Sequence, residues 1–284
     1  MEKNNFLSLG PHGFHRVAYV LWPGFNVSGC CVCVHGLTRN ARDFDILAQA
    51  LGADYAAVAC PDIVGRGCSD RLERPEDYGY PQYMADMAAL IARLGVERVD
   101  WVGTSMGGLI GMMLAAQPGS PIRRLVLNDI GAVIPGKALE RLAEYVGKAP
   151  FFESMQEVET YLRRVHGSFG TLDDAQWAHL ARHSARRGDD GRWTLNYDPA
   201  IAQGFVRNGE GRFDDVDLWA LWDRVRCPTL ILRGERSDIL SADCAREMVA
   251  RNACAQWVEI PNTGHAPALM AAEQIATVRA WLKK

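Results

Sequence analysis

From residue 30 onward, short apolar runs alternate with stretches that have helical periodicity. The runs are continuously hydrophobic, which indicates strands buried on both faces of a sheet. In the helical stretches apolar residues recur at i, i+3, i+4 and i+7, as at Phe44, Leu47, Ala48 and Leu51. This pattern predicts an α/β fold with a mostly parallel central sheet flanked by helices. The apolar runs cover residues 30–34, 55–60, 99–102, 122–127, 229–232 and 257–260.

The alternation stops between residues 133 and 213. Apolar residues there have helical spacing, for example over residues 155–165, and the connecting loops are rich in Gly, Asp and Arg. We therefore expect an α/β core made of residues 1–132 and 214–284, interrupted by a mostly helical insertion, residues 133–213. Ahead of the parallel sheet, Phe14–Trp22 is predicted to form a strand at an antiparallel edge.

Composition narrows the classes of partner and the cellular location. The formal net charge is −3 and like charges do not cluster, so we expect neither nucleic acid nor an anionic membrane as a partner. The N-terminal residues give no sign of a secretory signal or a spanning helix. The eight cysteines fall partly in an apolar run, without paired zinc-ligand spacings, and are interpreted as reduced, small hydrophobic residues. These features together predict a cytoplasmic protein.

A candidate nucleophile lies in the segment Gly103-Thr104-Ser105-Met106-Gly107, which matches the pattern G-x-S-x-G. The segment connects an apolar run to a helical stretch, the strand–turn–helix setting in which this motif presents a reactive serine. A tight turn strains the serine backbone there, and the glycines let strand and helix approach closely. Ser105 is therefore the predicted nucleophile, with Gly103 and Gly107 supporting the turn.

The serine hydroxyl needs a base to take its proton. Among the seven histidines, His265 comes just after the last apolar run and before the final helix. The carboxyl ends of parallel strands share one edge of the sheet, so this loop is expected beside Ser105. His265 is the predicted base.

The base in turn needs a carboxylate that orients its ring. Asp238 follows the apolar run that ends near Leu232, at the same predicted edge, and is the predicted acid. Asp129 follows the run that ends at Leu127 and is the alternative acid. Glu235 is a weaker candidate.

The predicted serine, carboxylate and histidine, in this chain order, and the loop that begins at His35-Gly36 resemble the α/β-hydrolase superfamily. Residues 62–69, Asp-Ile-Val-Gly-Arg-Gly-Cys-Ser, are similar to the D-x-x-G-x-G-x-S stretch that these enzymes carry after an early strand. The resemblance covers about residues 30–130 and 215–284. It implies that the insertion is the family's helical cap domain, placed after the sixth strand.

The resemblance also implies an oxyanion hole made of two backbone N–H groups, those of Leu37 and Met106. His35 and Gly36 then support this loop, and His35 is interpreted as a structural residue rather than a second base. The implied mechanism is covalent: Ser105 attacks a carbonyl to form an acyl-enzyme, the histidine shuttles the proton and the aspartate stabilises the imidazolium. No cofactor and no metal are expected.

Charge and polarity indicate the substrate class. Residues 133–213 carry eleven Lys/Arg and eleven Asp/Glu, so no net field selects a charged substrate. Leu37 and Met106 make the surroundings of the serine apolar. We therefore expect a carboxylic ester hydrolase that acts on a small neutral ester. Epoxide hydrolases and haloalkane dehalogenases are disfavoured, because they carry Asp where this chain has Ser105.

Other functions of the same scaffold stay open. The Gly-Thr-Ser-Met-Gly-Gly turn is close to that of the meta-cleavage C–C hydrolases, which act on diketone-like substrates. Those enzymes usually have an aromatic residue after the catalytic histidine, where this chain has Ala266. A thioesterase or acyltransferase is a further alternative. A non-catalytic ligand receptor on this fold is disfavoured by the complete set of catalytic residues. No oligomeric state is inferred from the sequence.

Overall fold

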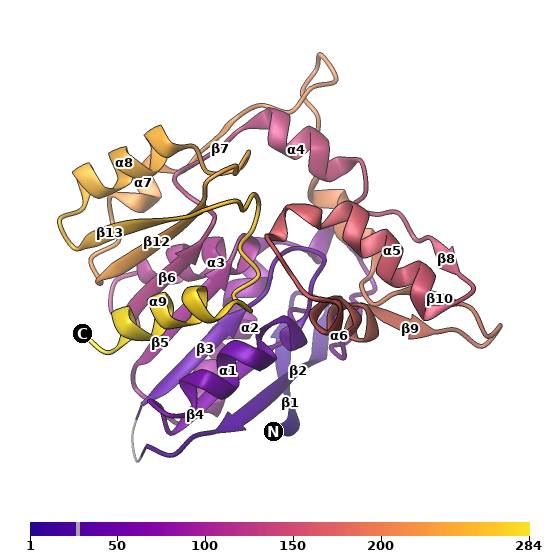
Figure 1. Ribbon diagram of the computed structural model, residues 1–284, viewed down its shortest axis with the longest axis horizontal. Coiled ribbons are helices and arrows are strands. Elements are labelled where there is room, and N and C mark those ends of the chain that lie inside the picture. Colours follow the sequence, from indigo (N-terminus) through magenta and orange to yellow (C-terminus); the bar gives the residue numbers. More distant parts are fainter. Residues whose placement is uncertain (27–28) are drawn as a thin grey trace.

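The computed structural model describes residues 1–26 and 29–284 and has an eight-stranded sheet at its centre (Figure 1). The strand order is β1-β2-β4-β3-β5-β6-β12-β13. Neighbours from β4 to β13 are parallel, whereas β2 is antiparallel to both β1 and β4. The strands are β1 (Glu2–Gly10), β2 (Gly13–Pro23), β3 (Cys30–Val34), β4 (Ala57–Pro61), β5 (Val99–Thr104), β6 (Ile122–Asn128), β12 (Thr229–Gly234) and β13 (Ala255–Ile260). The predicted mostly parallel sheet is confirmed.

The predicted strand at Phe14–Trp22 is β2, and it does join the sheet antiparallel to its neighbours. The outermost strand, β1, was not expected from the sequence. Its residues alternate in burial, with Phe6 and Ser8 buried and Leu7 and Leu9 exposed. A hydrophobic residue on both faces hides the period of two by which such an edge strand is recognised.

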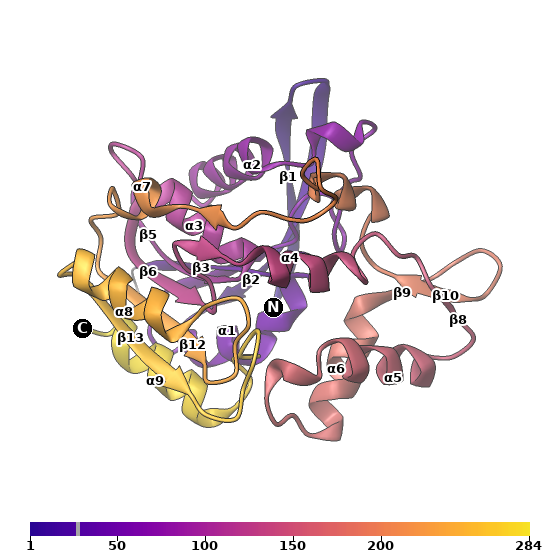
Figure 2. The ribbon, with the colours of Figure 1, turned by 90° about the horizontal axis from the view of Figure 1, so that it is seen from above.

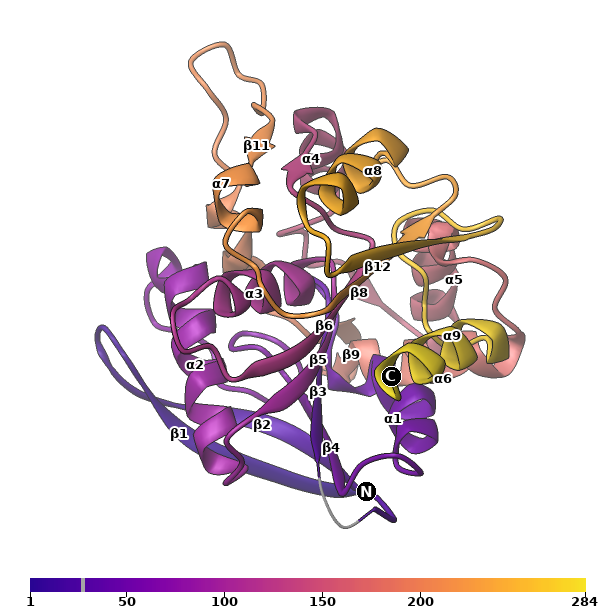
Figure 3. The same ribbon diagram turned by 90° about the vertical axis from the view of Figure 1, so that its left-hand side faces the viewer.

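Helices cover both faces of the sheet and create two layers of core. Figure 3 shows α2 and α3 on one side of the strands, and α1 and α9 on the other. Successive residues of a strand point to opposite faces, so Val32 packs in one buried cluster and Cys33 in the other. The helices outside the insertion are η1 (Ala41–Phe44), α1 (Asp45–Leu51), η2 (Pro75–Asp77), α2 (Tyr80–Arg93), α3 (Met106–Ala115), α7 (Trp219–Trp222), α8 (Ala242–Arg251) and α9 (Ala272–Leu282).

Residues 133–213, which we call the inserted segment, lie beside the carboxyl edge of the sheet (Figure 2). None of the described residues between β6 and β12 adds a strand to the main sheet. The helices predicted from apolar spacing are present, but the segment is less purely helical than expected. Its strands are only two or three residues long, too short to leave a periodic signal. The elements here are β7 (Val133–Ile134), α4 (Gly136–Ala143), β8 (Phe151–Phe152), α5 (Met155–Val165), η3 (Gly167–Phe169), α6 (Asp174–Ser184), β9 (Ala185–Arg187), β10 (Trp193–Leu195) and η4 (Pro199–Gly204), and β11 (Val216–Asp217) pairs with β7 just beyond it.

The loop of residues 62–69 attaches the inserted segment to the core. Within the loop, the Asp62 carboxylate accepts hydrogen bonds from the backbone N–H of Ala41 and Cys68. Burial raises the pKa of this carboxyl to about 6. The backbone N–H of Gly67 donates to the Asn196 carbonyl, which ties the loop to the inserted segment. The D-x-x-G-x-G-x-S stretch therefore has a structural explanation.

Within residues 1–26 and 29–284, the chain forms no helix of sufficient length and apolar character to traverse a membrane. All eight cysteines are free thiols, and five of them are buried: Cys30, Cys31, Cys33, Cys60 and Cys244.

Candidate active site

Ser105 occupies a strained turn between β5 and α3. Its φ of 51° lies in the left-handed region, which is unfavourable for a residue with a side chain. The turn is held by the Ser105 N–H, which donates to the Asn128 carbonyl at 2.9 Å. A Cβ atom on Gly103 would lie 2.3 Å from the carbonyl oxygen of Gly107, and one on Gly107 would lie 2.0 Å from that of Val34. Both glycines are therefore required for the close approach of β3, β5 and α3, as the motif predicts.

His265 lies between β13 and α9 and contacts the serine. Its Nε2 is 2.9 Å from Ser105 Oγ, and its Nδ1 is 2.8 Å from Asp129 Oδ2. A carboxylate only accepts hydrogen bonds, so it fixes the proton on Nδ1 and leaves Nε2 free to accept from the serine hydroxyl. The His265 side chain is 10% exposed and that of Asp129 is fully buried. The structure therefore brings together the predicted nucleophile, the predicted base and the alternative acid.

The Asp129 carboxylate is held in place by groups at the end of β12 and in the loop that follows it. It follows β6 directly and has a φ of 58°, which turns its side chain toward the neighbouring strand end. Its Oδ1 accepts from the backbone N–H of Gly234 at 2.7 Å, and its Oδ2 accepts from the Ser237 hydroxyl at 2.6 Å. Together with the histidine, these donors satisfy a carboxylate that is buried from solvent.

The prediction that Asp238 is the partner of His265 is wrong in this structure. Its carboxylate pairs with Arg141 on α4, with distances of 2.5 Å to Nε and 3.0 Å to Nη2, and its side chain is 45% exposed. The preceding residue, Ser237, already supplies the contact to Asp129, so the loop turns Asp238 outward. Glu235 is also remote from the histidine: its Oε2 accepts from the backbone N–H of Asn262.

The His35-Gly36 loop lies next to the serine. A Cβ placed on Gly36 would come within 3.7 Å of the Ser105 Cβ. His35 Nδ1 donates to the Gly36 carbonyl at 2.7 Å, and its Nε2 accepts from the Ile63 N–H at 2.9 Å. Burial lowers the pKa of His35 to about 4, so the ring is neutral at pH 7. This buried ring braces the loop, in agreement with its interpretation as a structural residue.

Arg66 is a buried cation that the sequence analysis did not single out. Its side chain connects the two residues predicted to form the oxyanion hole. Nε donates to the Leu37 carbonyl at 2.9 Å, and Nη2 lies 3.6 Å from the Met106 sulfur. Nη1 donates to the Val64 carbonyl and to the Tyr83 hydroxyl. The only sequence signal for this residue is its place between the two glycines of the 62–69 stretch.

The inserted segment also supports the histidine loop. The Ser168 hydroxyl donates to the His265 carbonyl at 2.6 Å, and the Gly264 N–H donates to the Ser168 carbonyl at 2.7 Å. One residue further on, the Phe169 carbonyl accepts from the Ala268 N–H at 3.3 Å. We call this contact of η3 with the loop the histidine strap. Sequence spacing gave no signal for it, because nearly a hundred residues separate its two sides.

Ser105 opens into an apolar cavity of about 550 Å³ between the core and the inserted segment. Among the described residues that line it, none is basic, and Asp214 and Asp215 are the acidic ones. Such a volume and lining suit a small, largely apolar molecule. The core side is formed by Leu37, Met106, Leu109, Met113 and Ile130, and the opposite side by Leu139, Leu142, Ile201, Phe205 and Phe213.

A serine, a histidine and a buried carboxylate at the carboxyl edge of a parallel sheet define a hydrolase-type site on an α/β scaffold. Residues 32–271 match the family described as the alpha/beta hydrolase fold, and the chain belongs to this family. The predictions of superfamily, fold and hydrolase activity are thereby confirmed.

Several proteins are similar over nearly the whole chain. The 3-hydroxybutyrate-oligomer hydrolase of Cupriavidus necator is 43% identical over 273 residues, which cover 94% of this chain and 93% of that protein. A putative hydrolase from Rickettsia typhi superposes with a TM-score of 0.92 at 31% identity, over 100% of this chain and 99% of that one. An α/β hydrolase from Novosphingobium aromaticivorans gives a TM-score of 0.87 at 36% identity, over 99% and 98%.

Proposed function

We propose that this protein is a serine esterase that cleaves short, soluble oligoesters of a hydroxy acid. The observation that carries the proposal is the continuous hydrogen-bonded series Asp129–His265–Ser105, which ends in the apolar cavity. The substrate class is taken from the Cupriavidus relative, whose name specifies 3-hydroxybutyrate oligomers. An oligomer of this kind is a chain of small ester units that ends in one carboxylate, and its ester units suit the largely apolar lining of the cavity.

The geometry supports a two-step acyl transfer. His265 Nε2 takes the proton of Ser105 Oγ as the oxygen attacks an ester carbonyl, and Asp129 stabilises the imidazolium that forms. The N–H groups of Leu37 and Met106 donate to the oxyanion. The C–O bond then breaks, and the imidazolium returns its proton to the departing alcohol, which is the hydroxyl of the next unit. Water, activated by the same histidine, hydrolyses the acyl-enzyme and restores Ser105.

The inserted segment, residues 133–213, acts in this proposal as the cap domain of a core made of residues 1–132 and 214–284. It supplies one side of the cavity, with Leu139, Phe205 and Phe213 opposite the core residues. A substrate must therefore fit between two walls, which favours soluble oligomers over the surface of a solid polymer. The cytoplasmic location stays a prediction.

The proposal is tested with linear dimers to tetramers of 3-hydroxybutyrate and with p-nitrophenyl esters from acetate to decanoate. Wild-type protein is expected to release monomer from the oligomers and to prefer short acyl chains. Ser105→Ala should lower kcat by about 10⁶-fold, because loss of a triad serine removes the covalent route. A fluorophosphonate probe should label Ser105 in the wild type, as detected by peptide mass spectrometry.

The outcomes separate this proposal from the alternatives on the same scaffold. Turnover of vinylogous 1,5-diketones without turnover of esters would replace it with C–C bond hydrolysis. Faster cleavage of acyl thioesters than of oxygen esters would indicate a thioesterase. Equal activity of Ser105→Ala and wild type would reject Ser105 as the nucleophile. Activity on p-nitrophenyl esters without release of hydroxybutyrate would keep the esterase and reject the oligomer substrate.

A further inference from the structure

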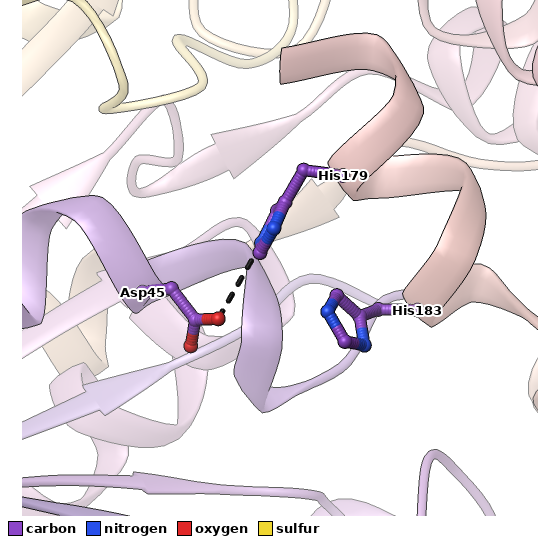
Figure 4. A group of neighbouring side chains, drawn as sticks. All are labelled: Asp45, His179 and His183. Carbon is purple, nitrogen blue, oxygen red and sulfur yellow. Dashed lines mark ion pairs between the residues drawn. The ribbon is translucent and has the colours of Figure 1, made fainter. Parts of the chain in front are cut away.

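Three metal-ligating side chains meet where the inserted segment contacts the core, away from Ser105. Asp45 is the first residue of α1, while His179 and His183 lie one turn apart on α6 (Figure 4). One ligand atom from each of the three residues lies within 4.8 Å of the others, and His179 Nε2 is 3.5 Å from Asp45 Oδ2. Histidines at i and i+4 share one face of a helix, the spacing with which helical zinc sites present two imidazoles.

Two hydrogen bonds join α6 to η1, the short helix that precedes α1, and to its N-cap. The Asn40 side-chain amide donates to the His183 carbonyl at 3.0 Å. His179 Nε2 donates to the Arg42 carbonyl at 2.9 Å. All three ligands are therefore carried on helices that already contact one another. Little of the chain must become ordered when an ion binds.

The carboxylate of the cluster is largely shielded from solvent. The Asp45 side chain is 9% exposed, which limits competition from water for this ligand.

We propose that Asp45, His179 and His183 form a binding site for a divalent transition-metal ion of zinc type that joins the inserted segment to the core. Two imidazoles and a carboxylate are ligands that Zn²⁺ accepts in tetrahedral sites, with water in the fourth position. The ion has no part in the ester cleavage. It fastens α6 to α1 and so stabilises the position of the inserted segment over the cavity.

Arg42 competes with the ion for the same carboxylate. Its guanidinium forms an ion pair with Asp45 through both Nε and Nη2. An incoming cation must displace this guanidinium from at least one carboxylate oxygen, and His179 must release its hydrogen bond to the Arg42 carbonyl. Removal of the Arg42 charge should therefore strengthen metal binding.

The test is titration of Zn²⁺ alone into the full-length protein by calorimetry, with thermal unfolding as a second readout. The background carries Cys68→Ser and Cys254→Ser, because these two thiols are exposed and a cysteine sulfur is a ligand that Zn²⁺ accepts. His179→Gln and His183→Gln should each weaken binding by about tenfold or more and remove the Zn²⁺-dependent rise in Tm. Arg42→Gln should bind more tightly than the parent.

The matched control is His12→Gln, which removes a histidine paired with Asp77 at 2.7 Å elsewhere on the surface and should leave binding unchanged. Circular dichroism of each variant without metal checks that the fold is intact. The proposal is overturned if the parent shows no saturable binding or if both histidine variants bind Zn²⁺ as the parent does. Weaker binding by Arg42→Gln would also overturn it, since Asp45 could then not be a ligand in competition with the guanidinium.

Discussion

The loops after β6 and β12 each present an aspartate at the same edge of the sheet, but the two aspartates have opposite environments. Asp129 is fully buried and accepts from Gly234, Ser237 and His265. Asp238 is 45% exposed and pairs with a cation of the inserted segment. Asp129 follows its strand directly, whereas Asp238 comes four residues after the end of β12 and is placed by the contacts of its loop.

A strand end fixes the residue that immediately follows it, whereas a residue further along the loop needs other contacts to hold it. The sheet sets the position of the first loop residue, so the register of β6 and β12 fixes the side chain of Asp129. Later loop residues are placed by their own turns and by whatever packs over them. The end of β12 and its loop therefore contribute the Gly234 N–H and the Ser237 hydroxyl to the site. The Asp238 carboxylate instead forms an ion pair with α4.

The largest effect is expected from Asp129→Asn. The amide keeps the shape of the side chain, but it can donate to His265 Nδ1 and so favour the wrong tautomer. By comparison with other triads, kcat should fall by about 10⁴-fold with little change in KM. Steady-state kinetics on a p-nitrophenyl ester measures this, with Asp238→Asn as the matched control. A greater loss in the Asp238 variant would restore the acid predicted from the sequence.

A second variant asks whether the two carboxylates are interchangeable. In Asp129→Asn/Arg141→Gln the Asp238 carboxylate is released from its ion pair. We expect kcat to stay at the level of Asp129→Asn, because the Ser237 contact still directs the loop away from the histidine. Recovery of activity by tenfold or more would mean that Asp238 reaches His265 once its ion pair is removed. The ion pair with Arg141, rather than the course of the loop, would then keep Asp238 out of the site.

Ser237→Ala should have an intermediate effect. It removes a hydroxyl that donates to the buried Asp129 carboxylate, and hydrogen bonds to charged groups contribute about 1.5–3 kcal/mol. If that stabilisation is expressed in the transition state, kcat falls by about tenfold to a hundredfold. Ser241→Ala is the control, since it removes an N-capping hydroxyl of α8 and no contact with Asp129. Equal kcat values for the two variants would argue against support of Asp129 by the β12 loop.

The smallest effect is expected at the exposed ion pair. A double-mutant cycle with Asp238→Asn and Arg141→Gln should give a coupling of less than about 1 kcal/mol in the free energy of unfolding, because solvent screens such pairs. The kcat of each variant should stay within about twofold of wild type. A coupling well above this value in urea unfolding would show that the contact between α4 and the core is stronger than its exposure indicates.

Much of the fold and most of the site could be predicted from the sequence. Continuous apolar runs identified the parallel strands, and Ser105 was found because its motif needs glycines at fixed positions. His265 lies beside Ser105 as predicted, although it comes five residues after the end of β13 and its loop is held by the contact with Ser168. The sequence offered two carboxylates at the same edge and no local property that distinguishes them. The choice depends on where Ser237 directs its hydroxyl, which is a tertiary contact.

Other features of the structure give no periodic or local signal in the sequence. Arg66 acts through contacts with the carbonyl of Leu37 and the sulfur of Met106, both distant in the chain. The cluster of Asp45, His179 and His183 unites an early helix with one more than 130 residues later. The members of this cluster become neighbours only when the inserted segment packs on the core, so the sequence of either segment by itself could not predict it.

The histidine strap has a consequence for how such enzymes diversify. Because η3 carries Ser168, which hydrogen-bonds to the carbonyl of His265 and to Gly264, the inserted segment cannot be exchanged as an independent module. A chimera that takes its cavity wall from a relative also receives a new contact for the loop that carries His265. Grafting succeeds most readily where the donor keeps a residue able to make both hydrogen bonds, or where the boundaries of the graft leave residues 167–170 of the recipient in place.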